Sequence, residues 1–164
     1  MRPISFSLYS CDALFRKIFI WLKAIAKRQN RLEKLWKAQW HGTLELKEKK
    51  AEQPSSPAFS RNWSWETVFA LIEGHRFIWW RSEKQFDTGE APLGQIYFAG
   101  HSGLAGLSPL DLKELSKEEI PFVVLIFGRG TQGQQKISLL APSSDAKDSL
   151  ENAVLDASMD AKAD

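Results

Sequence analysis

The fold is decided by residues 63–98, which read WSWETVFALIEGHRFIWWRSEKQFDTGEAPLGQIYF. Two apolar runs within this stretch meet at Glu73-Gly74-His75-Arg76, where the glycine is typical of a tight turn. A polar segment, Ser82 to Leu93, then leads into Gly94-Gln95-Ile96-Tyr97-Phe98. Apolar runs separated by turn residues in this way predict an antiparallel strand meander.

Further strand-like runs lie on both sides of the meander. Thr43 to Lys47 precedes it, whereas Phe122 to Phe127 and Lys136 to Leu140 follow it, with the glycine-rich residues 128–133 between them. A helical segment near Asp145 to Leu155 comes last. An all-antiparallel sheet followed by one helix belongs to the α+β class.

Read in this order, the chain from Gly42 to about residue 157 resembles a pleckstrin homology (PH) domain. The matching pieces are Gly42-Thr43-Leu44, residues 69–80, residues 89–96 and the terminal helix. The resemblance implies a partly open antiparallel β-barrel of about seven strands with a C-terminal capping helix. An irregular strand is expected at Gly106 to Leu112. The resemblance also implies a binding protein without a cofactor, and not an enzyme.

The sequence departs from the family pattern in two respects. The family's phosphoinositide signature has a basic residue late in the first strand and a Lys/Arg-x-Arg step early in the second, and the corresponding residues here are Leu46, Glu66 and Thr67. A carboxylate in this place would repel an inositol phosphate, so low headgroup specificity is expected. The family's closing helix usually carries a Trp, for which this chain offers Leu150 or Val154.

A long helix is predicted before the domain, because residues 12–39 contain no Gly or Pro. Apolar residues recur at helical spacing, and further apolar and basic residues complete an amphipathic pattern. The stripe is Leu14, Ile18, Trp21, Ile25, Leu32 and Leu35, widened by Phe15, Phe19, Leu22 and Trp36; the basic residues are Lys17, Lys23, Lys27, Arg28, Arg31, Lys34 and Lys37.

Three interpretations of this helix stay open. Its stripe fits a heptad seam interrupted by Arg28, so it could pack on the domain or pair with a second copy as a short coiled coil. A basic amphipathic helix with Trp and Phe on its other face is also typical of attachment to anionic bilayers. The first 30 residues, basic, with three serines and one acid, are compatible with a mitochondrial transit peptide as well.

Candidate lipid contacts come from two regions. Between Glu48 and Asn62 the composition changes to Lys, Glu, Gln, Pro and Ser, which predicts an exposed loop. In PH-like domains this loop borders the ligand mouth, and a simple solvated loop is the alternative. The candidate residues are Lys47, Lys49, Lys50, Arg61, Arg81 and Lys84 around the barrel and Lys23, Lys27 and Arg28 on the helix.

Seven tryptophans are present among the 164 residues, and two of them, Trp79 and Trp80, are neighbours on a predicted strand. Adjacent strand residues face opposite sides of a sheet. One of the pair should therefore enter the core. The other should face outward, either as an anchor for a partner or beneath the N-terminal helix.

Charge is distributed unevenly along the chain. Residues 1–41 carry nine Lys and Arg against two Asp and Glu, a net charge of +7, whereas the remainder has 13 against 18, a net charge of −5. A basic arm of this kind indicates an acidic partner, whether a membrane, a nucleic acid or its own domain. No base-reading motif is present, so nucleic acid is not the expected partner.

Motifs of catalysis and metal binding are weak. Gly100-His101-Ser102-Gly103 lacks the last glycine of a nucleophile elbow because Leu104 stands there, and residues 128–133 lack the lysine of a P-loop. The single Cys11 excludes an internal disulfide and favours a reducing compartment. Arg16, Lys17 and Lys23 interrupt the apolar run of the helix, so it is not expected to span a bilayer.

The sequence therefore predicts a basic helix (1–41), a PH-like domain (42–157) and a disordered tail (158–164). The predicted function is non-enzymatic recruitment to anionic membrane lipid, with a cytoplasmic, peripheral-membrane location. The alternative is a protein-protein interaction scaffold that pairs through residues 12–39.

Overall fold

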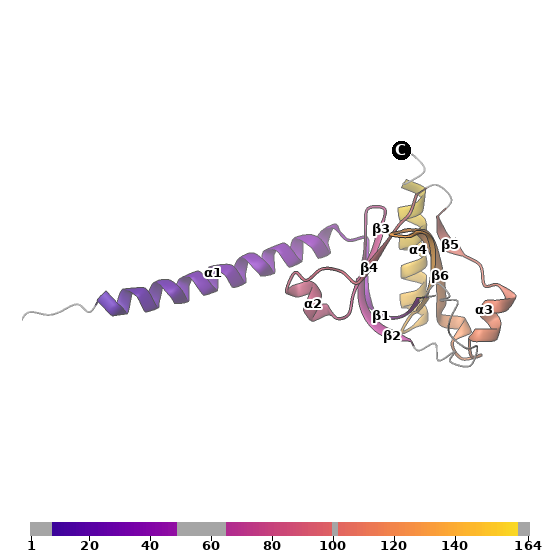
Figure 1. Ribbon diagram of the computed structural model, residues 1–164, viewed down its shortest axis with the longest axis horizontal. Helices are drawn as coiled ribbons and strands as arrows, with labels where there is room; N and C mark the ends of the chain where they lie inside the picture. Colours follow the sequence, from indigo (N-terminus) through magenta and orange to yellow (C-terminus); the bar gives the residue numbers. More distant parts are fainter. Residues whose placement is uncertain (1–7, 49–64, 100–101, 161–164) are drawn as a thin grey trace, which may run out of the picture. The chain divides into compact units, whose positions relative to one another are not determined.

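The computed structural model describes residues 8–48, 65–99 and 102–160. The chain divides into two compact units, Met1–Trp36 and Lys37–Asp164. The first contains the helix α1 and the second contains a β-barrel, and each is described by itself (Figure 1).

Helix α1 runs without interruption from Leu8 to Lys37, over 30 residues. It therefore begins before residue 12, the start of the predicted range, and it ends two residues before residue 39, the end of that range. The first half is strongly apolar on one side, since the positions 14, 18, 21, 22 and 25 follow steps of three and four residues. Long amphipathic helices of this kind usually gain their stability from a surface that covers the apolar stripe.

In its described residues, the second unit has seven antiparallel strands, three helices and one 3-10 turn. The strands are β1 (Trp40–Glu48), β2 (Glu66–Glu73), β3 (Arg76–Trp80), β4 (Gly94–Tyr97), β5 (Gly103–Ala105), β6 (Val123–Gly130) and β7 (Gly133–Leu140); the helices are α2 (Glu83–Asp87), α3 (Pro109–Glu114), η1 (Ile120–Phe122) and α4 (Ser144–Asp160). The strand order is β4-β3-β2-β1-β7-β6-β5. An additional pairing of β4 with β6 closes six of these strands into a barrel, with β5 as one more strand.

The closure depends on a single residue pair, Tyr97 on β4 and Arg129 on β6. Gly128 permits this approach, because a Cβ atom there would lie 2.3 Å from Ile96 Cγ2 and 2.5 Å from the Tyr97 carbonyl oxygen. The predicted α+β fold, a partly open barrel with a capping helix after a long helix, is confirmed. The seam is narrow because only one pair of residues bridges it.

The core lies inside the barrel and under α4. Inward positions alternate along each strand, as Val68, Ala70 and Ile72 do on β2. Helix α4 adds Leu150, Ala153, Val154 and Ala157 to the same cluster. In Figure 1 this helix, drawn in yellow, lies along the barrel. Leu150 and Val154, both 0% exposed, take the place expected for a tryptophan.

Helix α4 is longer than predicted. It continues to Asp160 rather than ending near Leu155, and Ala157 and Ser158 are buried. His75, in the β2–β3 turn, lies with its Nδ1 3.1 Å from the carbonyl oxygen of Ala157. The predicted disordered tail is therefore wrong for residues 158–160, since tertiary packing extends the helix. Residues 161–164 lie outside the described part of the chain.

The segment 106–112 also differs from the prediction, which placed an irregular strand there. The strand β5 lies before it, and residues 109–114 form α3. Ser108 and Asp111 make a capping box, and Pro109 occupies the first turn, which is a strong helix-start signal. Ser108, Pro109 and Asp111 form a local sequence pattern that indicates the start of a helix, and the prediction overlooked it.

Trp79 and Trp80 do face opposite sides of β3. Trp79 belongs to the barrel core, whereas Trp80 lies on the outer face beside Phe86 of α2, with ring centroids 5.0 Å apart. The indole nitrogen of Trp80 donates to the Glu90 carbonyl oxygen at 3.0 Å. Because Trp80 is only 8% exposed, the interpretation of an outward tryptophan as a partner anchor is wrong.

Candidate binding site

Two long connections leave the barrel from the same end. Strand β1 ends and β2 begins there, because Leu46 pairs with Glu66. Strand β3 also ends there, because Trp80 pairs with Phe69 near the start of β2. The end of β1, the start of β2 and the end of β3 therefore lie at one end of the barrel, while the β2–β3 turn lies at the opposite end.

The structure places some of the predicted lipid contacts at this end. Lys47 is partly buried on β1, whereas Arg81 follows β3 and Lys84 lies on α2, both exposed. Lys49, Lys50 and Arg61 lie outside the described residues. Lys23, Lys27 and Arg28 are exposed on α1, in the other unit.

Lys47 already has neighbours within the domain. Its ammonium group lies over the ring of Trp65, 5.5 Å from the centroid. The Trp65 indole in turn donates to Glu119 Oε1 at 2.8 Å. A backbone hydrogen bond from Ser116 lowers the pKa of Glu119, with burial opposing it and with Trp65 and Lys47 adding to the lowering. The positive charge of Lys47 is thus partly balanced by a nearby carboxylate.

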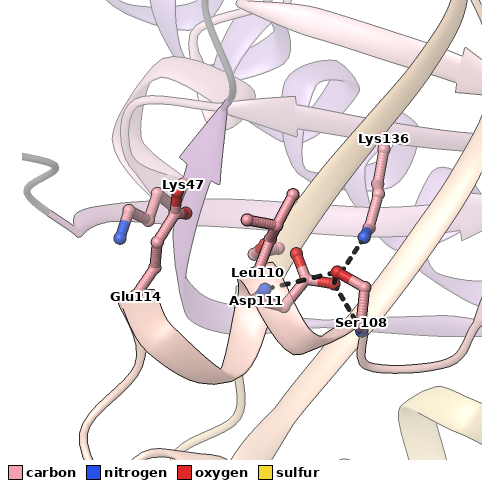
Figure 2. A pocket seen from close by; sticks show the side chains of 7 residues that line it. Lys47, Ser108, Leu110, Asp111, Glu114 and Lys136 are labelled. Carbon is pink, nitrogen blue, oxygen red and sulfur yellow. Dashed lines mark hydrogen bonds and ion pairs between the residues drawn. The ribbon is translucent and has the colours of Figure 1, made fainter.

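A small cavity of about 120 Å³ lies between α3 and the strands β1 and β7 (Figure 2). It is lined by Lys47, Ser108, Leu110, Asp111, Glu114, Lys136 and Ser138. Lys136 and Lys47 come from the strands, and the acidic groups come from α3. A cavity of this size is well below the 300 Å³ or so that holds a drug-sized ligand.

An internal ion pair occupies one side of this cavity. Lys136 Nζ lies 2.7 Å from Asp111 Oδ2, which also accepts from the Ser108 hydroxyl at 2.6 Å and from the Ser108 backbone N–H at 2.8 Å. Partial burial acts to raise the pKa of Asp111, but the hydrogen bonds from Lys136 and Ser108 outweigh it, so the pKa is lowered. The lining of the cavity thus contains two lysines and two acidic residues, so their charges cancel. Such a lining does not favour the binding of a phosphate group.

The family's phosphoinositide positions carry no cationic clamp. Leu46 is 5% exposed and belongs to the core, and its cross-strand partner is the exposed Glu66. Thr67 is exposed and uncharged. Sequence reasoning located these departures, but it missed the Trp65–Glu119 and Asp111–Lys136 contacts, because both join residues far apart in the chain.

Helix α1 shows the largest set of exposed apolar side chains. In its first half Leu14, Phe15 and Trp21 are 59%, 69% and 64% exposed. Arg28 lies one heptad after Trp21 and therefore interrupts the same stripe. Lys23 Nζ lies 4.5 Å above the Phe19 ring, so a basic group borders the apolar side directly.

Other kinds of site find little support in the described ranges 8–48, 65–99 and 102–160. There, no group of three His, Cys, Asp or Glu side chains could hold a metal ion, and no helix is long and apolar enough to cross a membrane. Ser102 is buried and its hydroxyl donates to the Ala99 carbonyl oxygen at 2.7 Å, as a turn residue would. Residues 130–133 form the tight turn between β6 and β7.

Comparison with solved structures relates the fold to PH domains. The solution structure of the PH domain of human pleckstrin homology domain-containing protein family A member 5 is similar with a TM-score of 0.50 and 13% identity, over 74% of this chain and 77% of that chain. A second human PH domain has a TM-score of 0.41 and 17% identity, over 74% of this chain and 87% of that chain. No family model and no curated protein matches the sequence. The fold is that of a PH domain.

Proposed function

We propose that this protein is a non-enzymatic recruitment module that binds anionic membrane lipid through α1, assisted by basic side chains around the PH-like barrel. Such a protein would act in the cytoplasm as a peripheral membrane protein. The observation that carries the proposal is α1 itself, with its exposed apolar first half bordered by basic side chains.

The physical argument has two parts. Burying Leu, Phe and Trp side chains in the bilayer interface supplies hydrophobic free energy, and each Lys or Arg near an anionic surface adds roughly 1 kcal/mol. Several such charges could replace the headgroup clamp that Leu46, Glu66 and Thr67 do not provide. This predicts attraction by charge, with little preference among anionic headgroups.

The test is sedimentation with liposomes that contain neutral lipid alone, phosphatidylserine, or a phosphoinositide. Charge reversal of Lys23→Glu together with Lys27→Glu should reduce binding to both anionic liposomes by about tenfold or more, because it removes favourable charge and adds repulsion. Lys113→Glu with Lys117→Glu is the matched control, since these exposed lysines lie on the domain and the net charge change is the same.

The two anionic liposomes also distinguish lipid binding by α1 from lipid binding by the barrel. If both double variants bound as the unmodified chain does, attachment through α1 would be refuted. If the α1 variant kept a preference for phosphoinositide, the barrel would carry a headgroup site that the positions 46, 66 and 67 do not explain. Binding should weaken steeply with ionic strength.

A second candidate function is favoured by the seven-residue spacing of Leu14, Trp21 and Leu35, which could form a seam between two copies of α1. The protein would then be an interaction scaffold. Sedimentation equilibrium distinguishes the two functions, because pairing predicts a mass that rises with protein concentration in the absence of lipid. Reversal of Lys23 and Lys27, outside that seam, should leave such a mass unchanged.

A further inference from the structure

Three residues form a row across the barrel seam, and the functions proposed above make no use of them. Arg76 on β3 pairs with Tyr97 on β4, and Tyr97 pairs with Arg129 on β6. Directly opposed residues of an antiparallel pair place their side chains on the same face. The neighbours Phe77 and Ile96 are buried inside the barrel, so the row faces outward.

The row is accessible. Tyr97 is 41% exposed, the Arg76 side chain is 38% exposed, and Arg129 is exposed as well. Adjacent strands are about 4.8 Å apart, so the two arginines flank the tyrosine closely on either side. Their long side chains can reach a group that is bound above the tyrosine ring.

The chemistry of the row suits an acceptor-rich group. Arg76 makes an exposed ion pair with Glu73 at 3.4 Å. Because exposed ion pairs are weak in water, Glu73 competes only weakly with a ligand for the Arg76 guanidinium. Within the described ranges, the Tyr97 hydroxyl and the Arg129 guanidinium make no hydrogen bond or ion pair. Two guanidinium forks and one phenol thus offer donors to a carboxylate without having to break strong internal contacts.

The residue types of the row, and its separation from the other basic groups of the barrel, favour a protein partner over a lipid. Strand β3 begins at Arg76 and ends at Trp80, a rise of roughly 13 Å. The connections with Arg81 and Lys84 leave from the Trp80 end, whereas the row lies at the β2–β3 turn. The row is therefore separated along β3 from the basic side chains Arg81 and Lys84, and Arg and Tyr are enriched in protein interfaces.

We infer that Arg76, Tyr97 and Arg129 form a docking site for an acidic, carboxylate-bearing segment of a partner protein. The site adds a second contact to the module, on a different part of the barrel from the proposed lipid contacts. Only the choice of protein over lipid uses the proposed function, because the donors and their exposure do not depend on membrane attachment.

The test uses the full chain, labelled with nitrogen-15 and titrated with an oligoglutamate peptide as the probe. The basic helix α1 will also attract this peptide, so the change in chemical shift must be measured for each residue separately. The backbone amides and arginine side chains of the row should shift and saturate. Arg129→Gln should weaken that binding about tenfold, because it removes a charge-assisted hydrogen bond.

Arg81→Gln is the matched control, since Arg81 is an exposed arginine at the other end of β3. It should leave the affinity of the row unchanged, and the spectrum of each variant shows directly that it is folded. Peptide-induced shifts confined to α1 would overturn the inference. Stronger binding of soluble inositol phosphate than of oligoglutamate at the row would also overturn it, in favour of a lipid headgroup, and the liposome test of α1 would be unaffected.

Discussion

Helix α1 and the barrel use apolar side chains in opposite ways. Leu14 on α1 is 59% exposed, whereas Leu150 on α4 is 0% exposed. The barrel encloses apolar residues at its inward strand positions together with residues of α4, and on its outer face Phe86 of α2 packs against Trp80. The helix carries a comparable stripe outside such a core. The difference shows that the barrel domain buries its apolar side chains within itself. The apolar stripe of α1 can be buried only against a surface outside the helix.

The largest effect is expected at the seam of the barrel. Gly128→Val should lower the free energy of unfolding by more than about 3 kcal/mol, because the added atoms overlap Ile96 and the Tyr97 carbonyl group. Chemical denaturation measures this change. Gly106→Val is the control, since nothing lies within 4 Å of a Cβ atom there, and it should alter the free energy of unfolding far less. Equal effects would mean that the seam does not depend on close approach.

A matched pair of leucines tests the comparison between helix and barrel directly. Leu150→Ala should lower the free energy of unfolding by about 2 to 3 kcal/mol, because it leaves a cavity under α4. Leu14→Ala removes an exposed side chain and should change it by less than about 0.5 kcal/mol. Thermal and denaturant unfolding measure both. A large loss from Leu14→Ala would show that α1 is part of the stable core.

The same pair separates stability from membrane binding. Leu14→Ala should weaken sedimentation with phosphatidylserine liposomes by about threefold to tenfold, because less apolar surface enters the interface. Leu150→Ala should leave this binding unchanged at temperatures where the variant remains folded. If both variants bound liposomes like the unmodified chain, the apolar stripe of α1 would not be the membrane contact.

The sequence was sufficient for the long helix and for every strand except β5, because alternating apolar positions and unbroken helical spacing are local patterns. The structure has β5 at Gly103–Ala105, before the predicted segment 106–112. The burial of Trp80 was beyond it, since that depends on Phe86 of a five-residue helix whose only signal was the cap at Ser82. The row Arg76, Tyr97 and Arg129 was also invisible. Its members are brought together by strand register across the seam, and spacing along the chain gives no sign of that.

The smallest effect concerns two carboxylates that tie the segment 106–122 to the barrel. The pKa of Asp111 and the pKa of Glu119 are both lowered from their ordinary values of 3.8 and 4.5. A lowered pKa in the folded protein contributes stability that is present above the unfolded value and lost as the pH falls through the folded value. The free energy of unfolding should therefore decline as the pH falls below about 4.5.

Glu119→Gln should flatten this decline and lower the stability slightly at neutral pH, because the amide cannot be an ionised acceptor for Ser116 and Trp65. Denaturant unfolding between neutral and acidic pH measures the slope. Glu118→Gln is the control at an exposed neighbouring position and should leave the slope as it is. If the two variants gave the same slope, the contact of Glu119 with Trp65 would not couple this segment to the barrel, and its attachment would have to come from the Asp111–Lys136 ion pair.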